Sequence, residues 1–84
     1  MPLFLRGVRL SHDRARDRWV VLAPEKLFLP DPVALEVLRL VDGMRTIAII
    51  VDLLAARFAA PRETISADVR ALVADLVGRR MLRT

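Results

Sequence analysis

The sequence predicts an α+β fold, in which a small N-terminal antiparallel β-sheet of three short strands is followed by three α-helices. Short runs rich in Val and Leu, separated by polar or proline-containing turns, occupy residues 8–29 and are typical of strands. From residue 31 onward, apolar residues recur at spacings of three and four, as in amphipathic helices. We therefore expect a single domain over residues 1–84. Its layout is similar to a winged helix-turn-helix with the wing moved to the N-terminus.

The composition excludes several classes of protein. The chain has no cysteine, so neither a disulfide framework nor a thiolate metal site is available. No apolar run approaches the roughly 20 residues that span a bilayer, and Met1–Leu5 is too short for a signal peptide. We therefore expect a cytoplasmic protein. The hydrophobic fraction of 55% is high for 84 residues and favours an exposed apolar patch that meets a partner.

Two strands joined by a polar turn are expected first. Gly7 opens a strand over Val8–Asp13, in which apolar and polar residues alternate. The charged segment Arg14–Asp17 makes the turn, and the return strand covers Arg18–Ala23. Together these segments predict a β-hairpin. We expect Trp19, the only tryptophan, to pack against the helices.

The rest of the chain is organised around a third strand, Lys26–Leu29. Pro24 and Pro30 bracket it, and because neither has a backbone N–H, pairing is confined to the residues between them. An apolar strand this short, with few partners in its own chain, is expected at the edge of the sheet. Such an edge is either protected or used to pair with another chain.

Three helices follow the strands. Asp31 is a favoured N-cap and predicts a helix over Pro32–Val41, whose proline suits the first helical position. Gly43 is expected in the left-handed position that follows this helix, and Glu36 is expected to pair with Arg39. Its apolar stripe comprises Val33, Ala34, Val37, Leu38, Leu40 and Val41.

Thr46 predicts the N-cap of a second helix over Ile47–Phe58. Pro61 opens a third helix, Pro61–Val77, and Arg79 and Arg80 are expected in its last turn, where positive charge is favourable. The core faces of these two helices comprise Ile47, Ile50, Val51, Leu54 and Phe58, followed by Ile65, Val69, Leu72, Val73 and Leu76.

No constellation of residues points to catalysis. The three glycines lie far apart in the sequence, which excludes a glycine-rich phosphate loop. His12 has no second His and no Cys with which to build a metal site, so it is interpreted as a solvent-facing strand residue. Asp68 and Asp75 are interpreted as part of a solvated acidic face. We therefore expect a binding module rather than an enzyme, without a metal or a cofactor.

Three kinds of binding remain open. A winged-helix DNA-binding regulator would use the third helix for recognition, but between Glu63 and Gly78 that helix has a single base, Arg70. The acids Glu63, Asp68 and Asp75 outnumber it, which disfavours an approach to phosphates. The strand Lys26–Leu29 instead offers main-chain pairing to an extended peptide, with pockets from the adjacent helix. The same edge and the excess apolar surface also fit a homodimeric structural module.

An ordered set of short motifs runs through the chain. It comprises Gly7-Val8-Arg9-Leu10, Trp19-Val20-Val21-Leu22-Ala23-Pro24-Glu25, Asp31-Pro32-Val33-Ala34, Asp42-Gly43, Arg45-Thr46, Ala60-Pro61 and Asp68-Val69. Together these motifs resemble the pyrroloquinoline quinone (PQQ) biosynthesis protein D family, PqqD. The likeness covers about residues 7–82 and leaves Met1–Arg6 unmatched. Lys26 stands where the family often has Arg, and Met81-Leu82 where it commonly has Gly followed by an apolar residue.

The resemblance implies a non-catalytic peptide chaperone in PQQ biosynthesis, a recognition element for ribosomally synthesised and post-translationally modified peptides (RiPPs). Such proteins hold a PqqA-type precursor peptide and present it to a radical S-adenosylmethionine (SAM) enzyme of the PqqE type, with the peptide added as a strand. The implied peptide-binding residues are Glu25, Lys26, Leu27, Phe28 and Leu29 on the third strand, and Asp68, Val69, Ala71, Leu72 and Asp75 on the third helix. Neither nucleic acid nor a membrane is expected as a partner. A homodimer formed through Met1–Leu5 or the free edge stays open.

Overall fold

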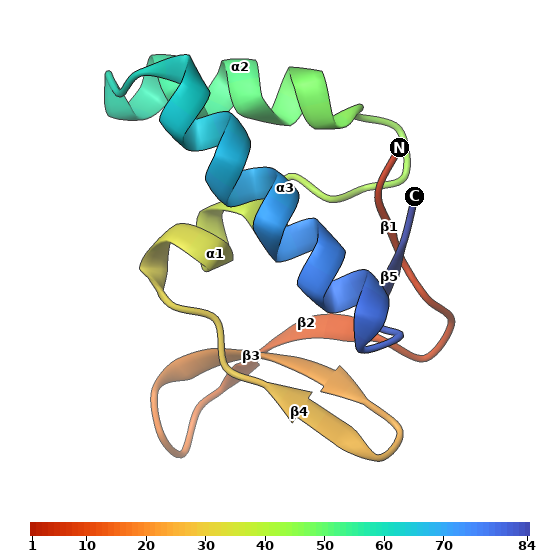
Figure 1. Ribbon diagram of the computed structural model, residues 1–84. Coiled ribbons are helices and arrows are strands. Elements are labelled where there is room, and N and C mark those ends of the chain that lie inside the picture. Colours follow the sequence, from red (N-terminus) through yellow and green to blue (C-terminus); the bar gives the residue numbers. More distant parts are fainter.

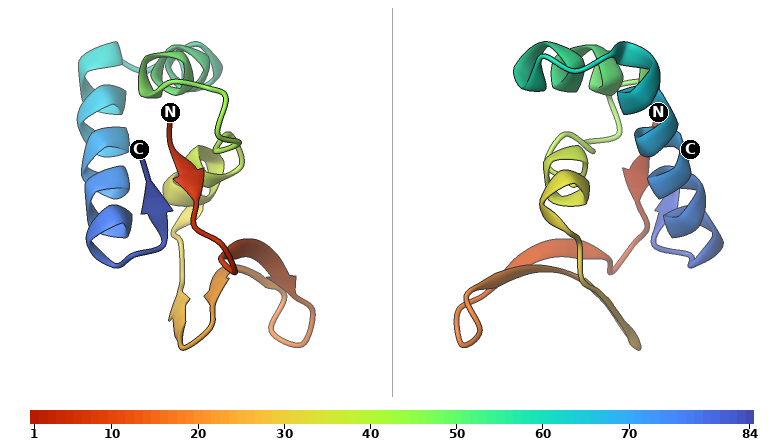
Figure 2. Two further views of the ribbon diagram at one scale, coloured as in Figure 1. Left: turned by 90° about the vertical axis from the view of Figure 1, so that its right-hand side faces the viewer. Right: turned by 60° about the vertical axis from the view of Figure 1, so that its left-hand side comes forward.

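Three helices stand over a small curved sheet in the computed structural model, which describes residues 1–84 (Figures 1 and 2). The elements in chain order are β1 (Leu3–Phe4), β2 (Arg9–Asp13), β3 (Arg18–Ala23), β4 (Lys26–Phe28), α1 (Pro32–Leu38), α2 (Ile47–Phe58), α3 (Arg62–Gly78) and β5 (Leu82–Arg83). The α+β class is therefore confirmed. None of the three helices is long and apolar enough to cross a membrane.

The hairpin β2–β3 is confirmed, although β2 begins at Arg9 rather than at Val8. Its register runs from Arg9 opposite Leu22 to Asp13 opposite Arg18. The Asp13 carboxylate accepts hydrogen bonds from the backbone N–H groups of Ala15 (3.1 Å) and Arg16 (3.4 Å), and it thereby shapes the turn between the strands.

Strand β4 continues the sheet through a two-residue turn, with Ala23 opposite Lys26, Leu22 opposite Leu27 and Val21 opposite Phe28. The strand order is β2-β3-β4, so β4 has a neighbour on one side only and the predicted edge is confirmed. The strand ends at Phe28 rather than at Leu29. Leu29 leaves the ladder because it leads directly into Pro30 and the cap of α1.

Helix α1 begins as predicted but ends earlier. The Asp31 carboxylate accepts a hydrogen bond from the backbone N–H of Ala34 at 2.7 Å, as an N-cap should. The helix stops at Leu38 instead of Val41, and tighter turns follow it. Gly43 has a left-handed φ of +78°, but it lies beyond those turns and does not end the helix.

Gly43 and its neighbours instead form a link to the N-terminus. The backbone N–H of Gly43 donates to the carbonyl oxygen of Pro2 at 3.0 Å. The Asp42 carboxylate accepts hydrogen bonds from the backbone N–H groups of Arg45 and Met44, which hold the pKa of Asp42 below its ordinary value. This loop is therefore held by local hydrogen bonds and by contact with the first residues of the chain.

The predicted pair between Glu36 and Arg39 is wrong. Glu36 forms an ion pair with Arg57 of α2, because the two helices bring these side chains together. The Arg39 guanidinium lies 4.9 Å from the centre of the Trp19 ring, and the centre of the His12 ring lies 5.1 Å from the centre of the Trp19 ring. Trp19 therefore contacts the end of α1 through a cation–π interaction.

Helices α2 and α3 form a pair joined by a short connection. Thr46 caps α2 as predicted, accepting from the backbone N–H of Ile49 at 3.1 Å. Helix α3 begins at Arg62, after Pro61, and no side chain caps it. Its end is a Schellman motif: the N–H of left-handed Arg80 bonds to the carbonyl of Val77. Arg79 and Arg80 thus follow the helix, rather than lying in its last turn as predicted.

The two chain ends pair with each other, which the sequence did not predict. Strands β1 and β5 are antiparallel, with Leu3 opposite Arg83 and Phe4 opposite Leu82. Leu82 and Pro2 are buried. The N-terminal arm is therefore paired within its own chain.

One apolar core joins the sheet, the helices and the β1–β5 pair, and it holds no buried charged side chain. The predicted core faces of the helices account for most of it, through Val37, Leu38, Val41, Ile50, Val51, Leu54, Ile65, Val69, Val73 and Leu76. Val8, Val21, Met81 and Leu82 complete the core.

Candidate functional site

The free edge of β4 presents side chains to two faces of the sheet. Phe28 lies opposite the fully buried Val21, so its side chain is on the inner face and packs against the core. Leu27 lies opposite Leu22 on the outer face and is 49% exposed, and Leu29 beyond the strand is 51% exposed. An apolar strand therefore meets solvent on its open side.

The main chain of Leu27 is the centre of this edge. In a hairpin with a two-residue turn, the residue pair next to the turn is hydrogen-bonded, and such pairs alternate with non-bonded ones. Lys26 and Phe28 are then bonded to β3, and Leu27 between them directs its N–H and C=O away from the sheet. These groups are suited to pairing with an added strand.

The inner face of β4 is connected to the end of α3 through Arg79. The Lys26 Nζ donates to the main-chain carbonyl oxygen of Arg79. The Arg79 guanidinium lies 5.6 Å from the centre of the Phe28 ring and donates from Nε to the Asp75 carboxylate at 3.0 Å. This cluster of four residues fixes the distance between the free edge and α3.

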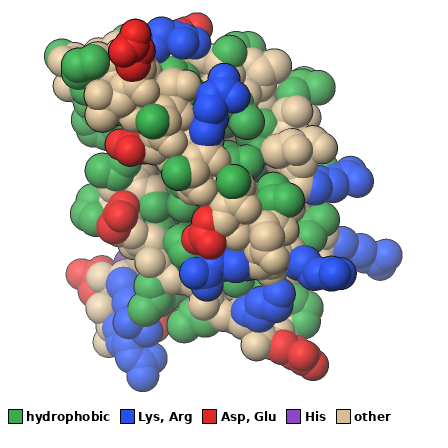
Figure 3. Space-filling view, viewed as in Figure 1, with side chains coloured by type: hydrophobic (Ala, Val, Ile, Leu, Met, Phe, Trp, Pro, Cys, Tyr) green, Lys and Arg blue, Asp and Glu red, His purple; other side chains and the backbone are tan.

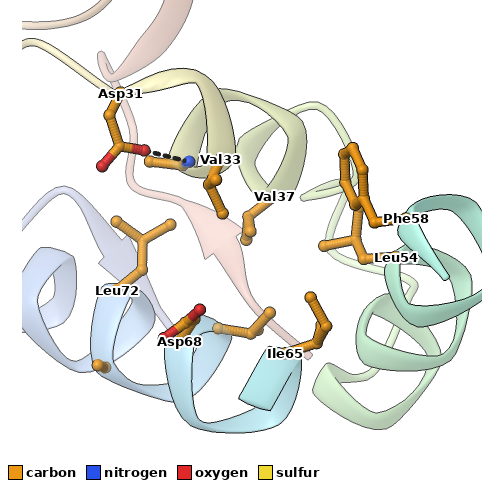
Figure 4. Close-up of a pocket in the computed structure, with 11 residues that line it drawn as sticks. Asp31, Val33, Val37, Leu54, Phe58, Ile65, Asp68 and Leu72 are labelled. Atoms are coloured by element: carbon orange, nitrogen blue, oxygen red, sulfur yellow. Dashed lines mark hydrogen bonds between the residues drawn. The ribbon is translucent and has the colours of Figure 1, made fainter. Parts of the chain in front are cut away.

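A cavity of about 340 Å³ opens between the three helices. Figure 4 shows α1 and the end of α2 facing α3 across it. Its lining comprises Asp31, Val33, Ala34 and Val37 of the α1 segment, Leu54 and Phe58 of α2, and Ile65, Asp68, Val69, Ala71 and Leu72 of α3. Nine of these eleven residues are hydrophobic, so the cavity suits an apolar side chain.

The cavity and the free edge are neighbours in the fold. Only Leu29 and Pro30 separate the end of β4 from Asp31, which lines the cavity. An extended chain that pairs with β4 and continues past Leu29 therefore reaches the cavity within a few residues, at about 3.3 Å per residue.

The residues implied for the site separate into three groups in the structure. The five residues from Glu25 to Leu29 form the free edge: Glu25 lies in the turn, Lys26–Phe28 form β4, and Leu29 follows the strand. Asp68, Val69, Ala71 and Leu72 line the cavity, although Val69 is only 1% exposed and contributes to its floor. Asp75 lies outside the cavity, in the ion pair with Arg79.

Two cavity residues were assigned to the core by the sequence. Val33 and Phe58 are 52% and 46% exposed and stand at the rim of the cavity. Helical periodicity correctly placed them on apolar faces, but it does not show whether a neighbouring element covers each end of a face. Asp31 was recognised only as a cap, and Arg79 only as a charge near the end of α3.

The surface around the site carries charges of both signs. Figure 3 shows hydrophobic side chains interspersed with Lys, Arg, Asp and Glu on the face of α3, rather than a continuous basic stripe. No group of three or more His, Cys, Asp or Glu side chains is arranged to hold a metal ion. His12 is exposed on β2 and bonds to Asp17 at 3.1 Å, as a solvent-facing residue. The features that stand out are an open strand edge and an apolar cavity.

A small α+β protein with an open edge strand next to an apolar cavity has the geometry of a module that binds an extended chain. Comparison with known proteins identifies the family. The family model described as coenzyme PQQ synthesis protein D (PqqD) matches residues 18–82. The chain belongs to the PqqD family.

Relatives and solved structures agree with this assignment. A protein of Gluconobacter oxydans named PqqA binding protein is 49% identical over 96% of this chain and 84% of its own length. A Xanthomonas oryzae protein of the same name is 49% identical over 98% of this chain and 89% of its own length.

Two solved structures share the fold. The PqqD part of Methylobacterium extorquens PqqCD, described as a functional and stand-alone RiPP recognition element, has a TM-score of 0.83 at 40% identity. The match spans 99% of this chain and 88% of the Methylobacterium chain. PqqD of Xanthomonas campestris has a TM-score of 0.69 at 45% identity, over 100% of this chain and 93% of its own.

Proposed function

We propose that this chain is a non-catalytic chaperone that binds a PqqA-type precursor peptide as an added strand on the free edge of β4. Residues 1–84 act as one binding domain. The relatives named PqqA binding protein support the choice of peptide. The observation that carries the proposal is the continuity between the open main chain of Leu27 and the apolar cavity beside Asp31.

The two parts of the site have different roles. The main-chain groups of β4 supply hydrogen bonds that any extended peptide can use, and they therefore give affinity. The cavity accepts one apolar side chain of the peptide and thereby fixes the register of the added strand, because a slip by one residue turns every side chain to the other face. The proposed contact residues are those from Glu25 to Leu29, together with Asp68, Val69, Ala71, Leu72 and Asp75.

The chaperone role follows from the cost of ordering a flexible peptide. Fixing one residue of a free chain costs about 1–2 kcal/mol of conformational entropy. A peptide that the chaperone already holds in an extended form therefore loses less entropy when it binds a second protein. We propose that the second protein is a radical SAM enzyme of the PqqE type. Co-sedimentation of the chain, PqqA and PqqE tests this step, and a sample in which the chain and PqqE never sediment together would contradict it.

Blocking the cavity tests the peptide site. Ala71 is exposed and lines the cavity, whereas Ala74 is exposed on the same helix and does not. In calorimetric titration with synthetic PqqA, Ala71→Trp is expected to weaken binding at least about tenfold, because the indole occupies the space of the peptide side chain. Ala74→Trp is the matched control and is expected to bind as the unaltered protein does. Equal affinity of both variants would contradict the cavity assignment.

A further inference from the structure

Two carboxylates, and no basic side chain, are found among the residues that line the cavity. They come from opposite walls: Asp31 precedes α1, and Asp68 lies on α3 (Figure 4). The remaining lining is apolar. The cavity is therefore negative as well as apolar.

The two carboxylates differ in what they already bind. Asp31 accepts the hydrogen bond that caps α1. Asp68 takes part in none of the side-chain hydrogen bonds or ion pairs of the protein. Its nearest candidate base in sequence, Arg70, donates from Nε to Ser66 at 3.1 Å instead.

The helix places Asp68 on the face that carries the rest of the site. Asp68, Leu72, Asp75 and Arg79 follow one another at spacings of four, three and four, so they form one stripe along α3. Asp75 is paired with Arg79. Asp68 is therefore the acid of this stripe that has no partner in the free protein.

We propose that Asp68 determines specificity. It selects a peptide in which Lys or Arg lies on the same face of the added strand as the apolar side chain that fills the cavity. This inference rests on the proposed peptide site. A peptide that covers Asp68 removes water from its carboxylate, which is costly unless a cation or a hydrogen-bond donor replaces that water. A peptide with Asp or Glu at this place is repelled, so the same residue favours one guest and rejects another.

The geometry predicts the spacing of the two peptide residues. Side chains on one face of a strand are two residues apart, or roughly 7 Å along the chain. The aliphatic stem of Lys or Arg can lie along the apolar side chains of Ala71 and Leu72 while its charged end reaches Asp68. We therefore expect the base two positions from the apolar residue in the cavity.

A charge-reversal experiment tests the inference with the whole chain. A set of synthetic PqqA peptides, with each position replaced in turn by Lys and by Glu, is titrated against the unaltered protein, Asp68→Asn and Asp68→Lys. At one position the unaltered protein is expected to prefer Lys over Glu by about five- to tenfold. Asp68→Asn is expected to lose that preference, and Asp68→Lys to reverse it, with the difference shrinking in 1 M salt.

Glu63→Lys is the matched control, because Glu63 lies on the same helix, is exposed and does not line the cavity. It is expected to keep the preference of the unaltered protein. If Asp68→Lys binds the peptides in the same order as the unaltered protein at every position, Asp68 does not select a cation and this inference is wrong, while the peptide site stands. If no peptide binds the unaltered protein, the proposed function fails and the inference fails with it.

Discussion

Lys26, at the start of β4, donates a hydrogen bond from Nζ to the main-chain carbonyl oxygen of Arg79, 53 residues further along the chain. Arg79 in turn contacts Phe28 of the same strand and pairs with Asp75 of α3. These contacts hold the free edge at a set distance from the helix. An edge strand that is already positioned loses less conformational entropy when a peptide binds.

The first prediction concerns this contact. Lys26→Met keeps the aliphatic stem but removes the hydrogen bond, so we expect up to about 1 kcal/mol less stability and peptide affinity lowered by up to about fivefold. Lys26→Arg retains a charged donor and is expected to stay close to the unaltered protein in both respects. Thermal unfolding and calorimetric titration measure the two effects. A Lys26→Met variant that binds more tightly would show that the contact hinders the peptide.

The second prediction concerns the outer face of the edge. Leu27→Asp or Leu29→Asp places a charge beside the added strand and removes an apolar contact, so peptide binding is expected to be abolished in calorimetry. The helical circular dichroism should stay intact, because both side chains are about half exposed and outside the core. Ile49→Asp serves as the control, since Ile49 is similarly exposed on α2, away from the edge. Unchanged affinity of the Leu27 and Leu29 variants would refute the strand assignment.

The third prediction concerns the loop that holds the N-terminus. Gly43 has φ = +78°, and a Cβ there would lie 2.7 Å from Cδ1 of Leu3. Gly43→Ala combines the cost of a left-handed conformation, about 1–2 kcal/mol, with a shift of the Leu3 side chain away from the new methyl group. Gly7 also has a positive φ, but its Cβ would meet Pro24 only at 3.6 Å, so Gly7→Ala is expected to cost less.

Chemical denaturation measures both glycine variants. Adding Leu3→Ala to Gly43→Ala removes the crowded methyl group, so the double variant is expected to lose less stability than the sum of the two single changes. If the stability losses of the two single variants add up to that of the double variant, contact with Leu3 does not contribute to the cost of Gly43→Ala.

The fourth prediction is a stabilising change. Arg80 has φ = +60° in the position after the C-cap of α3, where helices with this kind of end usually have glycine. Arg80→Gly removes the left-handed strain, and we expect it to raise the free energy of unfolding by up to about 1 kcal/mol. The Arg80 side chain is exposed and makes none of the ion pairs of the protein, so little is lost with it. A lower melting temperature would contradict this reading of the helix end.

The accuracy of the sequence predictions depended on how local each signal was. Asp31 and Thr46 were correctly assigned as caps, because a cap involves only the next three residues. The open edge of β4 was also predictable, since Pro24 and Pro30 confine the strand from either side. The five edge residues and the cavity wall on α3 then followed from the family resemblance.

What the sequence missed depends on contacts between distant segments. The pairing of β1 with β5 joins the two ends of the chain through two residues on each strand, which is too short for a periodic signal. Gly43 was expected to end α1, but its left-handed conformation serves the contact with Pro2. The rim residues Val33 and Phe58 look like core residues in the sequence, and only the arrangement of the three helices leaves them half exposed.

The most direct test of the account is an NMR titration of labelled protein with unlabelled PqqA, followed by measurement of contacts between protein and peptide protons. We predict cross-strand contacts between the peptide main chain and β4, slower hydrogen exchange of the Leu27 amide, and shifts of Ala71 and Leu72 in the cavity. A peptide that binds while the Leu27 amide keeps its exchange rate, with contacts only on another face of the protein, would contradict the central claim.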